Sequence, residues 1–280
     1  MRNLIITIIM ILSTNDTMAQ TKQTGHYANV NGLMLYYEIH GHGFPLVLVH
    51  GGGSSIPANF SYWLPLFSVT HKVIAVEMQA HGRTADIDRV TTFEQDADDI
   101  AALLRSIGVE KADLLGFSNG ATTSLQVGIR HPTLVRKLVL ASGTYKRNGM
   151  PEGFFEGMIQ ATMEVMPDEL KTSFLKINPD KAALQKMFDR DKARMIGFKD
   201  IDDSLIRAVK VPVLLLNGDK DVVSNDHVVA ISKLLPNAKL LIVPGGHGEY
   251  MGETDAKEVK GKLPGATAAI IEEFLHQDEK

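Results

Sequence analysis

The chain of 280 residues is 44% hydrophobic and 22% charged, with 24 Gly and 11 Pro, a composition that argues against disordered, collagen-like and repeat architectures. Its formal net charge of -4 leaves no basic surplus for a phosphate backbone, so we expect no nucleic-acid partner. The chain has no Cys, which excludes disulfides, thiolate nucleophiles and cysteine-based metal sites.

The first residues have the pattern of a secretory signal. Arg2 precedes an apolar run from Leu4 to Leu12, and Thr17-Met18-Ala19 places small residues near a cleavage point. The run is too short to span a bilayer, which takes about 20 residues. We therefore predict that residues 1–19 are a signal peptide and that the mature protein is exported, periplasmic or secreted, without a stable membrane anchor.

Short apolar runs then recur with the length of strands. Leu33 to Ile39 alternates loosely, and Pro45 to Val49 is continuous, as in a strand buried on both faces. Similar runs follow at 72–76, 112–115, 138–141, 213–216 and 240–243. Helical patterns lie between them at 93–107, 121–130 and 226–235. This alternation predicts an α/β fold with a mostly parallel sheet, helices on both faces, and ligands at the carboxyl ends of the strands.

One interval, from Tyr145 to Lys210, contains no strand-like run. We interpret residues 145–210 as an inserted helical cap on a core formed by residues 20–144 and 211–280. Six of the 12 Met lie in this cap, at 150, 158, 163, 166, 187 and 195. Flexible thioethers suit an apolar binding surface, and Met158 is our candidate contact, although packing of the cap would explain these Met equally well.

The sequence Gly116-Phe117-Ser118-Asn119-Gly120 lies where an apolar strand gives way to a helix. A sharp turn flanked by small residues can hold a serine hydroxyl above the sheet, at the N-terminus of a helix. The pattern G-x-S-x-G is weak alone, and its strand-turn-helix context gives it weight. Ser118 is therefore the candidate nucleophile.

A serine needs a base to take its proton, and the base needs a carboxylate to fix its tautomer. His247 follows the last apolar run through Pro244-Gly245-Gly246, and Asp221 follows the run at 213–216. The chain order Ser, Asp, His is that of the G-x-S-x-G hydrolases. Asp219 is the competing acid, and we favour Asp221 because turns commonly use an Asp at the earlier position for local backbone bonds.

A developing oxyanion needs two backbone N–H donors, which we assign to Asn119, directly after the nucleophile, and to Gly52 in the loop His50-Gly51-Gly52-Gly53. Glycine lets this backbone approach the substrate. We expect His50 to prop the loop rather than to carry a proton.

Pocket candidates follow from proximity to these residues along the chain. Gly53 lies next to the oxyanion donor, Phe60 follows the same loop, and Phe117 and Tyr250 flank the nucleophile and the base. Phe60 could instead pack the first helix against the sheet. We predict a substrate pocket formed by Gly53, Phe60, Phe117, Met158 and Tyr250.

These features resemble the α/β-hydrolase superfamily, with His50-Gly51-Gly52 after one early strand, Gln79-Ala80-His81-Gly82-Arg83-Thr84 after the next, and the elbow at Ser118. The resemblance runs from about Tyr27 to Phe274. It implies an eight-stranded sheet, a helical cap, a Ser-His-Asp triad and no cofactor. One departure is the polar stretch 252–265, which lengthens the connection to the last helix.

We therefore expect an exported serine hydrolase that cleaves a small-molecule carboxylic ester or lactone through an acyl-enzyme. Macrolactones are one option, as in the macrolide esterases that inactivate antibiotics. A carbon–carbon bond hydrolase and a perhydrolase could use the same triad, and a non-catalytic binding protein could retain the fold. The other His show no metal-ligand spacing, so we expect no metal. The oligomeric state stays open.

Overall fold

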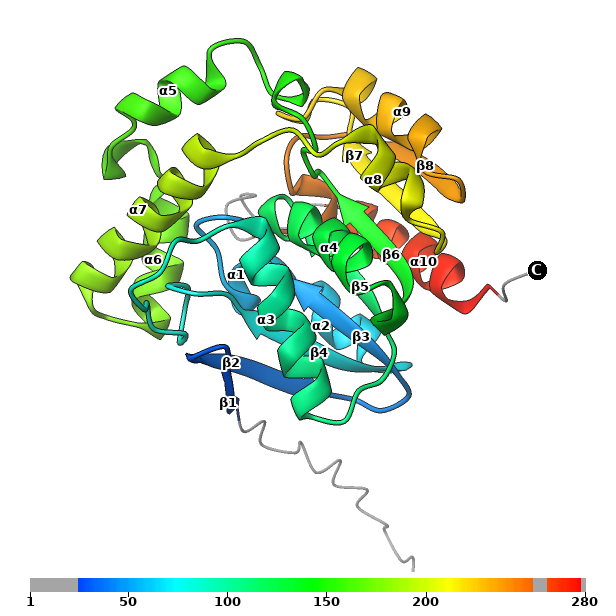
Figure 1. Ribbon diagram of the computed structural model, residues 1–280, viewed down its shortest axis with the longest axis horizontal. Coiled ribbons are helices and arrows are strands. Elements are labelled where there is room, and N and C mark those ends of the chain that lie inside the picture. Colours follow the sequence, from blue (N-terminus) through cyan, green and yellow to red (C-terminus); the bar gives the residue numbers. More distant parts are fainter. Residues whose placement is uncertain (1–24, 254–260, 278–280) are drawn as a thin grey trace, which may run out of the picture.

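The computed structural model describes residues 25–253 and 261–277, and its centre is an eight-stranded sheet of order β1-β2-β4-β3-β5-β6-β7-β8 (Figure 1). The strands are β1 His26–Val30, β2 Leu33–His40, β3 Phe44–Val49, β4 His71–Glu77, β5 Ala112–Phe117, β6 Val135–Ala141, β7 Val213–Gly218 and β8 Ala238–Val243. The pairs β1–β2 and β2–β4 are antiparallel, and the remaining pairs are parallel. The predicted fold class is confirmed.

Strand β3 shows why the apolar runs are continuous. Val47 and Val49 pack into the hydrophobic cluster on one face of the sheet, and Leu46 and Leu48 pack into the cluster on the other. Successive side chains of a strand point to opposite faces, so a strand covered on both sides needs apolar residues at every position. The edge strand β1 was not predicted, because its residues HYANV are mostly polar and exposed.

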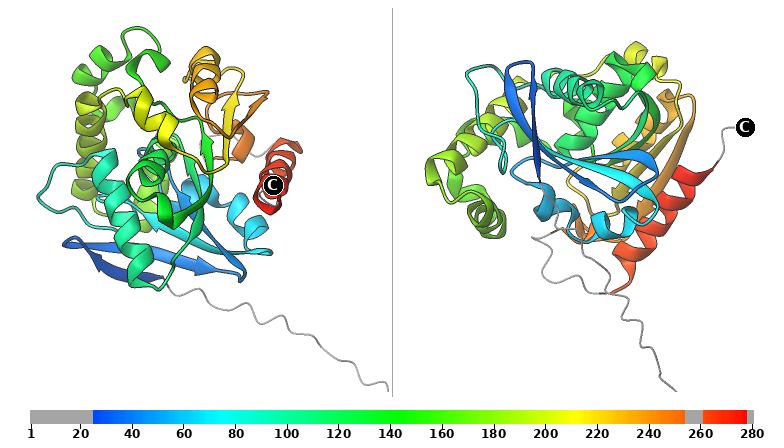
Figure 2. Two further views of the ribbon diagram at one scale, coloured as in Figure 1. Left: turned by 45° about the vertical axis from the view of Figure 1, so that its right-hand side comes forward. Right: turned by 90° about the horizontal axis from the view of Figure 1, so that it is seen from below.

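Helices cover both faces of the sheet. Residues of α3 Phe93–Ser106, α4 Asn119–Arg130 and α9 Asn225–Leu234 belong to one hydrophobic cluster, and residues of α1 Ile56–Phe60, α2 Trp63–Phe67 and α10 Leu263–His276 belong to the other. Figure 2 shows α10, in red, on the opposite side of the sheet from α3. In the described part of the chain, no helix has the length and apolar character needed to cross a membrane.

The predicted cap, residues 145–210, contains helices and no strand within the described residues. Its elements are η2 Arg147–Gly149, α5 Phe154–Gln160, η3 Met163–Val165, α6 Asp168–Ile177, α7 Lys181–Gly197 and α8 Asp203–Ala208. Helix α5 ends at Gln160, because Ala161 has an extended backbone, and its carbonyl accepts from the Lys192 ammonium at 2.7 Å. Two small clusters, containing Ala58 and Phe93 of the core, attach the cap.

Short 3-10 turns complete the described chain, η1 Pro132–Leu134 before β6 and η4 Glu249–Met251 after β8. The predicted signal peptide, residues 1–19, lies outside the described residues, as do residues 254–260 of the polar stretch. The loops that follow β3, β5, β6, β7 and β8 emerge at the carboxyl ends of parallel strands, and they contribute residues to the candidate site.

Candidate active site

Ser118 occupies a strained turn between β5 and α4. Its φ is 53° and its ψ is -120°, a conformation that costs a residue with a side chain about 1–3 kcal/mol. A Cβ on Gly116 would lie 2.1 Å from the Gly120 carbonyl oxygen, and a Cβ on Gly120 would lie 2.1 Å from that of Val49. The two flanking glycines are therefore required for the turn to pack against the sheet.

The structure brings the three predicted triad residues together. Nε2 of His247 lies 3.0 Å from Oγ of Ser118, and Nδ1 of His247 lies 2.7 Å from Oδ1 of Asp221. Asp219 points elsewhere, and its Oδ1 accepts a hydrogen bond from the Gly245 amide at 2.8 Å. Of the two competing acids, Asp221 therefore contacts the histidine, and Asp219 holds the turn of the histidine loop.

Asp221 is held as a carboxylate by several donors. Its Oδ2 accepts from Ser142 Oγ, and its Oδ1 accepts from the Val223 amide at 3.1 Å. Burial would raise the pKa of the Asp221 carboxyl, but the bond and charge of His247 and the Ser142 and Val223 donors lower it below its usual range. Asp221 is thus ionised at neutral pH and can orient the imidazole and stabilise its protonated form.

Ser142 and Tyr250 form a support behind the acid that the sequence reasoning missed. The Ser142 hydroxyl, which donates to Asp221, lies 2.5 Å from the Tyr250 hydroxyl. Tyr250 is fully buried, and burial raises the pKa of its phenol well above the ordinary value, so it remains a neutral donor. The position of Ser142, directly after β6 at the carboxyl edge of the sheet, is the feature of the sequence that could have indicated a residue of the site.

The predicted oxyanion donors lie beside the nucleophile. Gly52 and Asn119 line the same cavity as Ser118. Asn119 is the first residue of α4, where amides have no carbonyl partner within the helix, and the Gly52 amide makes no hydrogen bond to another described residue. The arrangement leaves two N–H groups for an anionic oxygen.

His50 props the oxyanion loop, as expected. Its Nδ1 donates to the Gly51 carbonyl at 2.8 Å, and its Nε2 accepts from the Met78 amide at 3.1 Å. Burial and the nearby charge of His81 lower the pKa of His50 to about 3, so the ring stays neutral. A neutral ring with both nitrogens bonded to backbone groups is not available to exchange protons with a substrate.

Asp191 of α7 is a buried carboxylate of the cavity wall that the sequence did not single out. Its Oδ2 accepts from the Gly53 amide at 2.5 Å and lies 2.9 Å from Nε2 of His81. Its Oδ1 accepts from Arg194, which also pairs with Asp96 at 2.8 Å. The cap thereby contacts the oxyanion loop through a charged network.

The charges of this network are fixed by mutual contact. Burial would raise the pKa of the Asp191 carboxyl, yet the His81 and Arg194 charges and the Gly53 amide hold it well below its usual range. Burial opposes protonation of His81, but the charge and hydrogen bond of Asp191 raise its pKa above the ordinary value. Asp191 is therefore a carboxylate whose charge is compensated within the protein.

We predict that Asp191→Asn lowers kcat by roughly 10- to 100-fold with little change in KM, because the Gly53 amide loses its charged acceptor and the oxyanion loop shifts. The free energy of unfolding should fall by about 3 kcal/mol. Asp189→Asn is the matched control, since Asp189 is exposed on the same helix. An Asp191→Asn enzyme with reduced thermal stability and unchanged kcat would limit this residue to a structural role.

A cavity of about 270 Å³ opens beside Ser118 and His247. Gly53 and Met158, two predicted pocket residues, line it. Its apolar wall consists of Met150, Phe154, Met158, Met166, Leu170, Phe188, Met195, Val222 and Val223. Of the cap methionines, Met187 instead packs with no exposed surface between α6 and α7, and Met163 packs against the same cluster. Some methionines of the cap therefore line the cavity, and others pack in the hydrophobic interior of the cap.

Three predicted pocket residues do not line the cavity. Phe60 is fully buried in the cluster beneath the sheet, with α1. The Phe117 side chain points to that same face, because it alternates with its neighbours in β5, and its ring packs 4.7 Å from the His247 ring. Tyr250 lies behind Ser142. The assignment of these aromatic residues to the substrate pocket is wrong.

Comparison with known proteins gives a family model, described as alpha/beta hydrolase fold, that matches residues 45–166. The 2-hydroxy-6-oxo-6-(2'-aminophenyl)hexa-2,4-dienoic acid hydrolase of Metapseudomonas resinovorans is 26% identical over 214 residues, which are 70% of this chain and 74% of that protein. The dihydrolipoyllysine-residue acetyltransferase component of the acetoin cleaving system of Pseudomonas putida is 26% identical over 251 residues, 89% of this chain. The chain spans 63% of the length of that relative.

Among solved structures, a serine hydrolase involved in carbazole degradation superposes with a TM-score of 0.73 at 24% identity, covering 90% of this chain and 98% of the other. The likeness in fold therefore extends well beyond residues 45–166.

Proposed function

We propose that this chain, which has the α/β-hydrolase fold, is a serine hydrolase that cleaves a carboxylic ester or lactone through an acyl-enzyme. The observation that carries this proposal is the hydrogen-bonded series Ser118, His247 and Asp221, with separations of 3.0 and 2.7 Å, at the edge of an apolar cavity.

In the first half of the reaction, Ser118 Oγ attacks the ester carbonyl carbon while Nε2 of His247 takes its proton. The carbonyl oxygen becomes an oxyanion, to which the amides of Gly52 and Asn119 donate. When the tetrahedral intermediate collapses, the bond to the alcohol oxygen breaks and His247 returns the proton to the leaving alcohol. Ser118 is left as an ester of the acyl group.

In the second half, a water molecule gives its proton to His247 and its oxygen attacks the acyl carbon. Collapse of this second intermediate breaks the bond to Ser118 Oγ, which regains a proton from His247, and the carboxylic acid leaves. Asp221 stays ionised throughout and stabilises the imidazolium that forms in each half.

The lining of the cavity favours a neutral ester over a carbon–carbon bond substrate. The relative from Metapseudomonas resinovorans acts on a dienoic acid, a substrate that carries a carboxylate. Among the described residues that line the cavity, Lys192, whose ammonium donates to the Ala161 carbonyl, is the one Lys or Arg, and the carboxylate Asp191 lies in the same wall. An anionic substrate group would meet this single ammonium, a carboxylate and a mostly apolar surface, so we expect a neutral acyl group to fit this wall better.

Hydrolysis of p-nitrophenyl esters with acetyl, butyryl, hexanoyl and dodecanoyl groups tests the proposal. We expect kcat/KM to rise by up to about fourfold per added methylene as the apolar wall is filled. It should fall for dodecanoyl, because a cavity of about 270 Å³ is at the small end of ligand pockets.

The same panel should include lactones from small rings to macrolides, together with a dienoic acid substrate of the carbon–carbon bond hydrolases. Turnover of the dienoic acid with none of any ester or lactone would replace our proposal by carbon–carbon bond cleavage. Turnover of no compound by folded protein would favour a binding role for the fold.

A further inference from the structure

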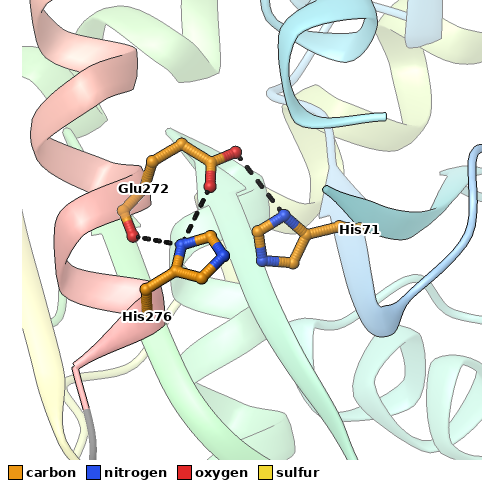
Figure 3. Close-up of side chains that lie close together, drawn as sticks. All are labelled: His71, Glu272 and His276. Atoms are coloured by element: carbon orange, nitrogen blue, oxygen red, sulfur yellow. Dashed lines mark hydrogen bonds and ion pairs between the residues drawn. The ribbon is translucent and has the colours of Figure 1, made fainter. Parts of the chain in front are cut away.

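A second cluster of chemically active side chains lies away from the cavity, between β4 and α10. His71 is the first residue of β4, and Glu272 and His276 are one helical turn apart at the end of α10 (Figure 3). Because Glu272 lies 201 positions after His71 in the chain, the spacing along the chain gave no indication of a metal site.

The cluster holds its donor atoms close together. Oε1 of Glu272 lies 3.5 Å from Nδ1 of His71, and Oε2 lies 3.2 Å from Nδ1 of His276. One ligand atom from each of the three residues can be chosen so that all lie within 4.8 Å of one another. In Figure 3 the carboxylate lies beside the two neighbouring imidazole rings, with one oxygen directed toward each.

These distances match the coordination of a small divalent ion. Ligands about 2.1 Å from a tetrahedral Zn²⁺ are separated from each other by about 3.4 Å. The two separations have this size but end on different oxygens of Glu272, so the carboxylate must turn to offer one oxygen to both imidazoles, and His276 must approach His71. The His276 side chain is 55% exposed, so it is free to exchange its bond to the Glu272 carbonyl for an ion.

The surroundings tolerate a cation. The cluster lies at the C-terminal end of α10, where the helix dipole favours positive charge. Arg136 nearby is paired with the buried Asp113, and the Lys137 ammonium donates to the carbonyls of Phe274 and Leu275. Of the three cations of the adjacent cavity, Arg136 is therefore compensated by a carboxylate, Lys137 is hydrogen-bonded to the end of α10, and Lys111 is exposed.

We propose that His71, Glu272 and His276 bind a divalent transition-metal ion. Two imidazole nitrogens and one carboxylate oxygen are ligands that Zn²⁺ accepts, with a water molecule in the fourth position. The site lies at the amino end of β4, whereas Ser118, Asp221 and His247 follow the carboxyl ends of their strands. The ion therefore ties α10 to the sheet and takes no part in the proposed ester hydrolysis.

Tag-free, EDTA-treated protein titrated with ZnCl₂ by calorimetry tests this site. We expect one Zn²⁺ per chain and a Tm increase of roughly 5 °C at about 100-fold excess over Kd. Affinity should fall at least about tenfold in His276→Ala and Glu272→Gln, both of which change partly exposed side chains. His42→Ala, which removes an exposed histidine outside the cluster, should bind as the native chain does.

His247→Ala provides a second control, because the catalytic histidine is another possible Zn²⁺ ligand. Binding that survives in His247→Ala and disappears in His276→Ala supports the cluster. No stoichiometric binding to folded protein, or equal affinity in the native chain, His276→Ala and Glu272→Gln, would overturn the proposal. These outcomes are read without ester hydrolysis, so they do not depend on the proposed function.

Discussion

Ser118→Ala is expected to lower kcat/KM for any ester that the protein cleaves by roughly 10⁴- to 10⁶-fold. The reason is geometric, since Ser118 Oγ is the atom 3.0 Å from the imidazole nitrogen that takes its proton. Loss of that oxygen removes the acyl-enzyme route and leaves only the binding site and the oxyanion donors. Steady-state kinetics on the best ester of the panel would measure the effect.

Two controls separate loss of chemistry from loss of structure. Ser118→Ala should unfold at nearly the native Tm, because the amide and carbonyl groups of an alanine at this position can make the same hydrogen bonds with Ala141 and Ala121. Ser61→Ala, at an exposed serine, should retain native kinetics. A Ser118→Ala enzyme that keeps more than about a tenth of native kcat/KM would exclude Ser118 as the nucleophile.

Asp221→Asn is the second large effect, with an expected loss of about 10⁴-fold in kcat. An amide in place of the carboxylate can donate to Nδ1 of His247, which selects the tautomer with its proton on Nε2. That tautomer cannot take the proton of Ser118. The neutral amide also removes the negative charge that stabilises the imidazolium.

Asp219→Asn is the matched control, since it makes the same chemical change two residues away. Its amide oxygen can still accept from the Gly245 amide, so kcat should stay within a few-fold of the native value. Pre-steady-state acylation rates for both variants would give the comparison. A larger loss in Asp219→Asn than in Asp221→Asn would reverse our assignment of the acid.

Local patterns explain what the sequence predicted well. The core strands were recognised because burial on both faces demands unbroken apolar runs, as in β3 and β7. Ser118 was recognised because its strained turn needs small neighbours at fixed positions, and Gly116 and Gly120 meet backbone atoms where a Cβ would clash. Although Gly120 meets the carbonyl of the distant Val49, each of these patterns is written in a few consecutive residues, so one sequence is enough to reveal it.

Contacts between distant segments explain what was missed. Asp191 contacts His81 and Gly53 across 110 and 138 residues, and nothing in the pattern of α7 distinguishes this acid from the exposed Asp189. Phe117 and Tyr250 were assigned to the pocket because they neighbour catalytic candidates. Nearness along the chain does not fix direction, and both rings pack beneath or behind the site instead.

One helix of the cap connects the wall of the cavity to the oxyanion loop. Helix α7 Lys181–Gly197 supplies Asp191 to the oxyanion loop, while Met195 of the same helix lines the cavity. A substrate that contacts this wall therefore also contacts α7, the helix whose Asp191 accepts a hydrogen bond from the Gly53 amide. The kinetics of Asp191→Asn across the acyl series would therefore show whether chain-length preference depends on this contact.

The most direct test of the central claim is labelling with a fluorophosphonate, followed by intact-mass and peptide mass spectrometry. The account predicts one adduct per chain, located on Ser118, absent from Ser118→Ala and formed far more slowly in Asp221→Asn. Adduct formation on another serine with Ser118 unmodified, or no adduct on folded protein, would contradict the assignment of Ser118 as an activated nucleophile.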